Sequence, residues 1–122
     1  MKENNEYKLE ERTLRFSVQV IRHCARLRQP VLRSITDQLI RAATSVGANY
    51  AEANNASSKS DFRAKIFIAK KEAAESKYWL NILIELGDKS EEVILVKEEA
   101  QRLLMTFQKI INTMRQNENR KT

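Results

Sequence analysis

Glycine and proline are scarce in this sequence, and their scarcity limits the available folds more than any other feature. The chain of 122 residues contains two glycines and one proline. β-Sheets need many tight turns, and turns are where these two residue types are mostly used. The composition therefore predicts a few long helices joined by short loops, in one domain that spans residues 1–122.

Apolar residues recur at alternating spacings of three and four along four segments, which is the period of an amphipathic helix. The expected helices cover approximately residues 9–27, 32–53, 60–86 and 90–114. Pro30 separates the first helix from the second, Ser58 is one of three candidate N-caps of the third, and Gly87 is its expected stop. The polar tail after residue 114 is expected to fray. This pattern predicts an all-α, up-down-up-down four-helix bundle.

The first helix carries more apolar surface than one bundle core needs. The stripe expected to face the core consists of Leu14, Val18, Ile21 and Ala25. A second stripe beside it consists of Phe16, Val20, Cys24 and Leu27. Exposed apolar area on this scale usually marks an interface, so we expect a homo-oligomer. The alternative is an irregularly packed monomer.

The second helix contains a strip of small residues formed by Ala43, Gly47 and Ala51. Gly47 costs about 1 kcal/mol relative to alanine inside a helix, which close packing of another backbone would offset. We therefore expect the backbone of a neighbouring helix to approach closely along this strip.

The sequence argues against catalysis and against a bound metal. Its only histidine, His23, has no glutamate three residues before it, as a di-iron bundle would require, and one cysteine is too few for zinc. His23 is expected to be a partly exposed side chain, and Cys24 a packing residue rather than a nucleophile. Gly47 and Gly87 alone cannot build a phosphate-binding loop. We predict no catalytic residue, no metal, no cofactor and no enzymatic activity.

The net charge of +6 favours an anionic partner. Four arginines follow one face of the first expected helix and form the candidate nucleic-acid site: Arg12, Arg15, Arg22 and Arg26. Few aromatic side chains are free to stack on bases, so recognition of backbone or shape is expected. The alternative is a solvated basic face without a ligand.

A polar strip borders the apolar face of the second helix. It consists of Gln38, Arg41, Ser45, Asn49 and Glu52. Glu72 borders the apolar face of the third helix in the same way. Our hypothesis is that Arg41 pairs with Glu72 where the two helices meet, and that Ser45 and Asn49 hydrogen-bond nearby. Such a network fixes register and adds little net stability, which favours a structural role over a catalytic one.

Three motifs occur between residues 38 and 80, in the stretch QLIRAATSVGANYAEANNASSKSDFRAKIFIAKKEAAESKYWL. The first lies in the second expected helix, the next in the loop after it, and the last in the third expected helix. The matching residues are Gln38, Leu39, Arg41, Ala42, Ser45, Val46, Asn49 and Glu52, then Ser58, Lys59 and Phe62, then Lys71, Glu72, Ala73, Glu75, Ser76, Tyr78, Trp79 and Leu80. With them, the sequence closely resembles the four-helix bundle proteins encoded within intervening sequences of bacterial 23S rRNA genes. Gly47 and the segment after Glu52 depart from the commoner forms of this pattern.

The resemblance implies a homopentameric, barrel-like assembly. It also implies kinship with the accessory variability determinant protein of diversity-generating retroelements, which binds nucleic acid and a reverse transcriptase. The biochemical function of the family at large is not established.

From these observations we expect a non-enzymatic, self-assembling bundle that binds structured RNA or DNA through a basic surface. The alternative is a protein-interaction scaffold with no nucleic-acid role, and a nuclease with an unfamiliar site is a weaker third option. A single cysteine excludes an intrachain disulfide, and no signal peptide or apolar run of the ~20 residues that a membrane span needs is present. We therefore expect a cytoplasmic protein.

Overall fold

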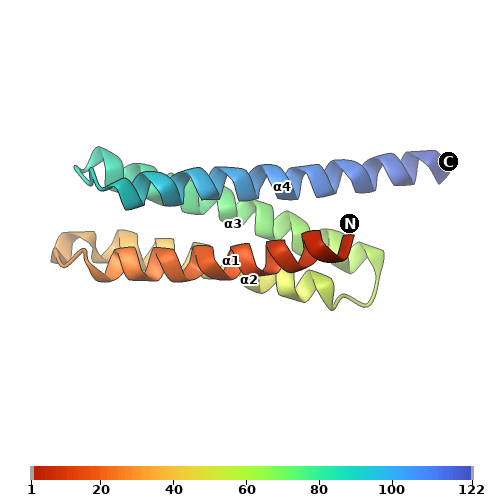
Figure 1. Cartoon of the computed structure of the whole chain (residues 1–122), viewed down its shortest axis with the longest axis horizontal. Coiled ribbons are helices and arrows are strands. Elements are labelled where there is room, and N and C mark those ends of the chain that lie inside the picture. The colour runs from red at the N-terminus through yellow and green to blue at the C-terminus, as the bar shows by residue number, and fades with distance from the viewer. Residues whose placement is uncertain (1, 122) are drawn as a thin grey trace.

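The computed structural model describes the backbone of residues 2–121 and the side chains of residues 8–120. The elements are α1 (Lys2–Ala25), a short 3-10 turn η1 (Pro30–Leu32), α2 (Arg33–Asn54), α3 (Lys59–Glu85) and α4 (Glu91–Lys121). Successive helices run antiparallel, so the α1–α2 and α3–α4 connections share one end of the molecule (Figure 1). The predicted all-α four-helix bundle is confirmed. None of the helices in this described part is long and apolar enough to cross a membrane.

Local sequence signals set the ends of α3 and the start of α4. Ser58 caps α3, since its hydroxyl oxygen accepts a hydrogen bond from the backbone N–H of Asp61 at 3.0 Å. Gly87 follows α3 with a φ of 111°, a conformation that favours glycine at helix ends. The hydroxyl oxygen of Ser90 then accepts from the N–H of Val93 at 3.1 Å in the first turn of α4.

The outer helices are longer than the sequence predicts. α1 begins at Lys2, and α4 continues to Lys121, so the expected fraying after residue 114 is wrong. The last turns of α4 lie against the start of α3. There the guanidinium of Arg115 stacks over the ring of Phe67 at 5.9 Å, and Glu118 pairs with Arg63. These contacts compensate for the lack of apolar residues at the end of α4.

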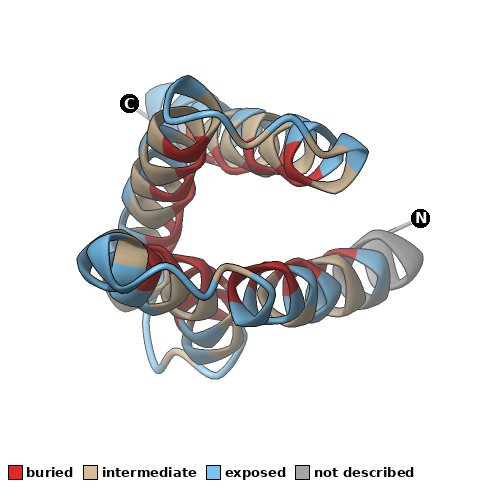
Figure 2. Cartoon of the chain, turned by 90° about the vertical axis from the view of Figure 1, so that its left-hand side faces the viewer, coloured by how far each residue is buried: buried red, intermediate tan, exposed pale blue. Residues whose placement is uncertain are grey.

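The core is a continuous apolar layer on the inner sides of the helices (Figure 2). Phe16 and Phe107 are its largest fully buried side chains. The ring of Tyr50 packs against that of Phe107, with 6.0 Å between the centroids. On α3, Ile66, Ala73 and Leu80 are among the buried residues that face this core.

On α1 the predicted orientation of the two apolar stripes is reversed. Phe16, Val20 and Cys24 are buried, whereas Leu14 is 64% exposed and Ile21 is 43% exposed. The side of α1 that meets α2 has room only for small side chains, and Thr13 lies there. Placing Thr13 against α2 rotates Phe16 into the core and Leu14 outward.

The strip of small residues on α2 is where α1 approaches, as predicted. A Cβ atom at Gly47 would lie 3.3 Å from the Cβ and Oγ1 atoms of Thr13. One turn away, the hydroxyl of Ser17 donates to the backbone carbonyl oxygen of Ala43 at 3.1 Å. Gly47 and Ala43 therefore permit a contact between the two helix backbones that larger residues would prevent.

Replacing Gly47 with leucine is expected to lower the free energy of unfolding by about 1–3 kcal/mol, because the new side chain must displace Thr13. Urea denaturation monitored by circular dichroism measures this change. Ala64→Leu, at an exposed position on α3, is the matched control and should change stability by less than about 0.5 kcal/mol. Equal stability of the two variants would refute the close approach.

Candidate functional site

The four arginines predicted to form a basic face on α1 have different surroundings. Arg12 donates two hydrogen bonds to Glu99 of α4, at 3.2 Å from Nε and 3.0 Å from Nη2. Arg15 pairs with Glu11 on its own helix. These two guanidinium groups are therefore engaged by carboxylates, which reduces the charge they offer to an external anion.

The other two arginines lie nearer the end of α1. Arg26 donates to Glu92 of α4 at 3.1 Å and keeps 69% of its side chain exposed. Arg22 is exposed, and among the described side chains no carboxylate lies within ion-pair distance of it. Three of the four arginines thus lie on α1 and Arg26 directly follows it, and only Arg22 has no carboxylate within ion-pair distance among the described side chains.

His23 is buried, so its expected partial exposure is wrong. Only 4% of the residue is exposed, because the start of α4 and the loop before it cover the ring. Nδ1 lies 2.7 Å from a carboxylate oxygen of Glu92, and Nε2 lies 2.6 Å from one of Asp88. His23 therefore joins α1 to α4.

Asp88 is the carboxylate most tightly held by this bridge. Burial acts to raise its pKa, but hydrogen bonds from Ser90 and from His23 outweigh burial and hold the pKa below the ordinary 3.8. The backbone N–H of Ser90 donates to the second carboxylate oxygen of Asp88 at 3.1 Å. Asp88 is therefore ionised near neutral pH and fully engaged within the fold.

Cys24 lacks the properties of a nucleophile. Burial, together with the charges of Asp37 and Asp88, raises the pKa of the Cys24 thiol to about 11. The thiol is therefore protonated near neutral pH, whereas the thiolate is the reactive form. No group of three or more His, Cys, Asp or Glu side chains suited to a metal ion occurs among the described residues.

The polar strip of α2 forms two separate clusters. Arg41 donates from Nη1 to Glu72 at 2.9 Å, which confirms the predicted pair between α2 and α3. Its Nε donates to Gln38 at 3.3 Å. Nearer the α2–α3 loop, Asn49 donates from Nδ2 to the carbonyl and hydroxyl oxygens of Ser45, at 2.8 and 2.9 Å, as expected. Glu52 reaches Lys65 of α3 at 3.6 Å and takes no part in either cluster.

The Arg41 cluster extends further than predicted. Arg41 also pairs with Glu75, and this hydrogen bond, with the charge of Glu72, raises the pKa of Arg41. Trp79 donates from Nε1 to the same carboxylate of Glu75 at 3.1 Å. Tyr78, 58% exposed, packs edge-on against Trp79 with 5.2 Å between the ring centroids. The spacing of Glu75 and Trp79, one helical turn apart, was the signal for this contact.

Sequence reasoning also missed a concentration of charge at the loop end of the bundle. No acidic residue occurs between residues 12 and 36. Besides the four arginines already described, this run contains Arg28 and Arg33, and the α3–α4 connection contains Lys89. All three side chains are exposed. No carboxylate of the described side chains lies within ion-pair distance of these three residues. The absence of acidic residues from this run was the sequence signal that could have predicted the unpaired positive charge.

An apolar groove of about 650 Å³ lies on the outside of the bundle between α1 and α2. The exposed Leu14 stands beside it, and Gly47, Ala48 and Ala51 form its α2 wall. Further exposed aliphatic side chains lie on α4, including Leu95 and Met105. Among residues 8–120, no side chain covers these separate apolar surfaces.

Comparisons with known proteins give a consistent result. A family model described as 23S rRNA-intervening sequence protein matches residues 5–116. The fold is similar to the crystal structure of a protein of unknown function from the S23 ribosomal protein family of Bacteroides thetaiotaomicron. That protein is 29% identical, the TM-score is 0.76, and the match covers 84% of this chain and 97% of the other. No curated protein matches the sequence.

Removing the bridge between α1 and α4 should destabilise the protein. His23→Ala is expected to lower the free energy of unfolding by about 1–3 kcal/mol, because Asp88 and Glu92 would each lose a hydrogen-bond partner at the contact between α1 and α4. Urea denaturation tests this expectation. The neighbouring exposed Arg22→Ala should stay within about 0.5 kcal/mol of the wild type. Equal effects of the two substitutions would contradict the bridge.

The depressed pKa of Asp88 predicts how stability depends on pH. Because the folded pKa lies below the unfolded value, ionised Asp88 stabilises the fold above pH 3.8, and this contribution disappears as the pH falls through the folded pKa. The stability difference between the wild type and Asp88→Asn should therefore be largest above pH 3.8 and shrink in more acidic solution. Unfolding by urea across this pH range measures it. The same trend in Asp37→Asn, at an exposed position of α2, would refute the assignment to Asp88.

Proposed function

The chain belongs to the family of 23S rRNA-intervening sequence proteins, and we propose that it is a non-enzymatic, self-assembling helical bundle that binds structured RNA or DNA. The observation that carries this proposal is the exposed, unpaired positive charge at the end of α1 and in the loop after it. Arg22, Arg28 and Arg33 are exposed there, within a segment that contains no acidic residue. Phosphate groups are the natural counterions for such a surface.

The chemistry of this surface suits backbone contacts. Arginine presents a planar fork of donors that matches phosphate geometry. The exposed Tyr78 and the half-buried Trp79 belong to α3 and not to the basic segment, and Trp79 is engaged with Glu75. With no aromatic platform among the arginines, binding rests on phosphate positions and on the shape of the nucleic acid.

Self-assembly is proposed from the unpartnered apolar surfaces. The groove between α1 and α2 offers a concave surface beside Leu14, whereas Met105 and Leu95 project from α4. An interface between two different surfaces is heterologous, and repetition of such a contact closes into a ring when the rotation allows. We propose the homopentamer that the family resemblance implies. Several basic ends in one assembly would raise the avidity for a long anionic strand.

The absence of catalysis is part of the proposal. His23 has both ring nitrogens on carboxylates of the fold, so it has no nitrogen left for a substrate. The Cys24 thiol is buried and protonated. A free thiol also suits the reducing cytoplasm, where we propose that the protein resides.

A protein-interaction scaffold is the second candidate, and the Arg41 cluster favours it. Tryptophan, tyrosine and arginine are the residue types most enriched at energetic centres of protein interfaces. Here Arg41, Tyr78 and Trp79 meet on the outer side of α2 and α3, and carboxylates hold the arginine and the indole in place. A partner protein docked there would leave the basic end unoccupied.

Nucleic-acid binding is tested by fluorescence anisotropy with an RNA hairpin and a DNA duplex across a salt series, on protein whose mass is known from light scattering. The wild type should bind with an affinity that falls steeply as salt rises, because each phosphate contact releases counterions. Arg22→Gln/Arg28→Gln, which removes two of the unpaired arginines, should reduce the slope of log affinity against log salt by about two.

Lys109→Gln/Arg120→Gln is the matched control, since both residues are exposed on α4 and lie toward the other end of the bundle. It removes the same net charge and should keep the wild-type slope. Absence of binding at low salt would refute the nucleic-acid role and leave the scaffold as the better candidate. Strand cleavage that His23→Gln abolishes would refute the non-enzymatic assignment.

A further inference from the structure

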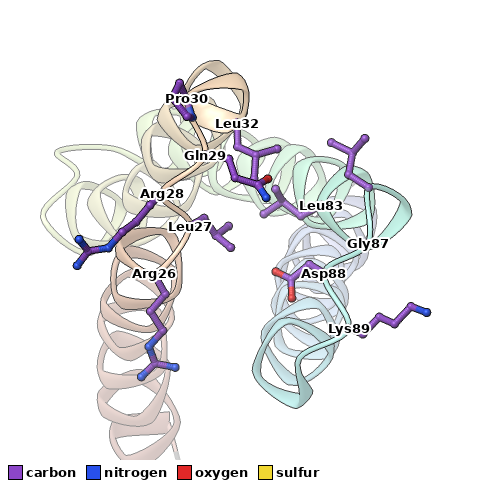
Figure 3. A pocket seen from close by; sticks show the side chains of 11 residues that line it. Arg26, Leu27, Arg28, Gln29, Pro30, Leu32, Leu83, Gly87, Asp88 and Lys89 are labelled. Atoms are coloured by element: carbon purple, nitrogen blue, oxygen red, sulfur yellow. The ribbon is translucent and has the colours of Figure 1, made fainter.

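The loop end of the bundle contains a hollow that the basic surface alone does not explain. It has a volume of about 630 Å³ and lies between the α1–α2 connection and the α3–α4 connection. Figure 3 shows its lining side chains, of which Leu27, Leu83 and Asp88 turn inward, whereas Arg28 and Lys89 extend outward from its two sides. This volume falls within the range typical of ligand pockets, about 300–1,000 Å³.

Hydrogen bonds hold both walls of the hollow. On one wall, the N–H groups of Arg26 and Leu27 donate to the last carbonyls of α1 at 3.1 and 3.0 Å. On the other wall, the N–H of Asp88 donates to the carbonyl of Leu83 at 3.0 Å. The contact between His23 and Asp88 then connects the two walls. A pocket built from restrained loops loses little entropy when a ligand binds.

The interior of the hollow is aliphatic. Leu83, only 1% exposed, forms its floor, and the half-buried Leu27 and Leu32 stand beside it. Apolar surface continues beyond the hollow, because Leu86 is 62% exposed and Val31 is 80% exposed on the two connections. The aliphatic surface therefore extends past what a small molecule in the hollow would cover.

The rim is positively charged. Arg28 and Lys89 have no carboxylate within ion-pair distance among the described side chains, so their long side chains are free to turn over a ligand. Arg26 shares its charge with Glu92. The one carboxylate of the lining, Asp88, is already engaged by His23 and Ser90 and therefore repels an anion less than a free aspartate would.

We propose that this hollow docks an acidic peptide segment of a partner protein, with aliphatic side chains on the leucine floor and carboxylates on Arg28 and Lys89. An apolar centre with a charged rim is the general design of a protein-docking site. A nucleic-acid strand fits less well, because none of the lining residues is aromatic and bases bind single-strand sites largely by stacking. The peptide site shares Arg28 with the phosphate-binding surface proposed above, whereas its aliphatic floor and Lys89 lie outside that surface.

The test uses a fluorescein-labelled peptide of alternating glutamate and leucine, measured by anisotropy against the full chain. Its binding should weaken about tenfold in Arg28→Glu/Lys89→Glu and in Leu86→Ser, which remove the rim charge and the exposed aliphatic contact respectively. All three residues are exposed, so the variants should fold, which circular dichroism verifies.

Two matched controls accompany these variants. Lys109→Glu/Arg120→Glu makes the same change of net charge elsewhere, and Ile68→Ser removes an exposed aliphatic side chain from α3, away from the hollow and from the apolar surfaces proposed for assembly. Both should bind the peptide as the wild type does, and a peptide with serine in place of leucine should bind at least tenfold more weakly.

Four results would overturn the proposal. The first is a loss of peptide affinity in Lys109→Glu/Arg120→Glu as large as that in Arg28→Glu/Lys89→Glu, and the second is binding of the serine peptide as tight as that of the leucine peptide. The third is no binding of the peptide to the wild-type chain at millimolar concentration. The fourth is displacement of the peptide by an oligonucleotide whose own binding depends on Leu86. The last result would assign the hollow to nucleic acid.

Discussion

Charged side chains hold α1 against α4, and the rest of the surface depends on this bridge. Arg12 binds Glu99, and His23 fills the space between Asp88 and Glu92. A charge engaged inside the fold is not available to a ligand, so the bridge determines which cations remain free. They lie toward the loop end, where no carboxylate of the described side chains is within ion-pair distance of Arg22, Arg28 or Arg33. The same bridge fixes the loop that carries Asp88 and with it one wall of the hollow.

The helices most completely predicted are those with the strongest local signals. α2 and α3 begin and end within one residue of their expected limits. A proline before α2, the Ser58 cap and the Gly87 stop mark these boundaries, and each acts through its immediate neighbours. The extension of α4 to Lys121 was not predictable in this way, because Arg115 and Glu118 find their partners on α3.

The orientation of α1 shows why periodicity alone was insufficient. Its two stripes have the same period and nearly the same apolar content, so either satisfies the rule for an amphipathic helix. The choice depends on Thr13, whose small side chain fits against Gly47 on another helix. Likewise, Arg41 and Glu72 were predictable as a pair because both border adjacent apolar faces. His23 and Arg12 were not, since their partners lie 65 to 87 residues away in the sequence.

The antiparallel order of the helices places the α1–α2 and α3–α4 connections at one end of the bundle, and the start of α1 and the end of α4 toward the other (Figure 1). The end with the two connections carries Arg28 and Lys89, which have no ion-pair partner among the described side chains. In any ring whose axis runs parallel to the helices, every copy points the same end in the same direction. Such a ring would have two unlike faces, one presenting the α1–α2 and α3–α4 connections and the other the α2–α3 loop, so a partner could recognise one face without binding the other.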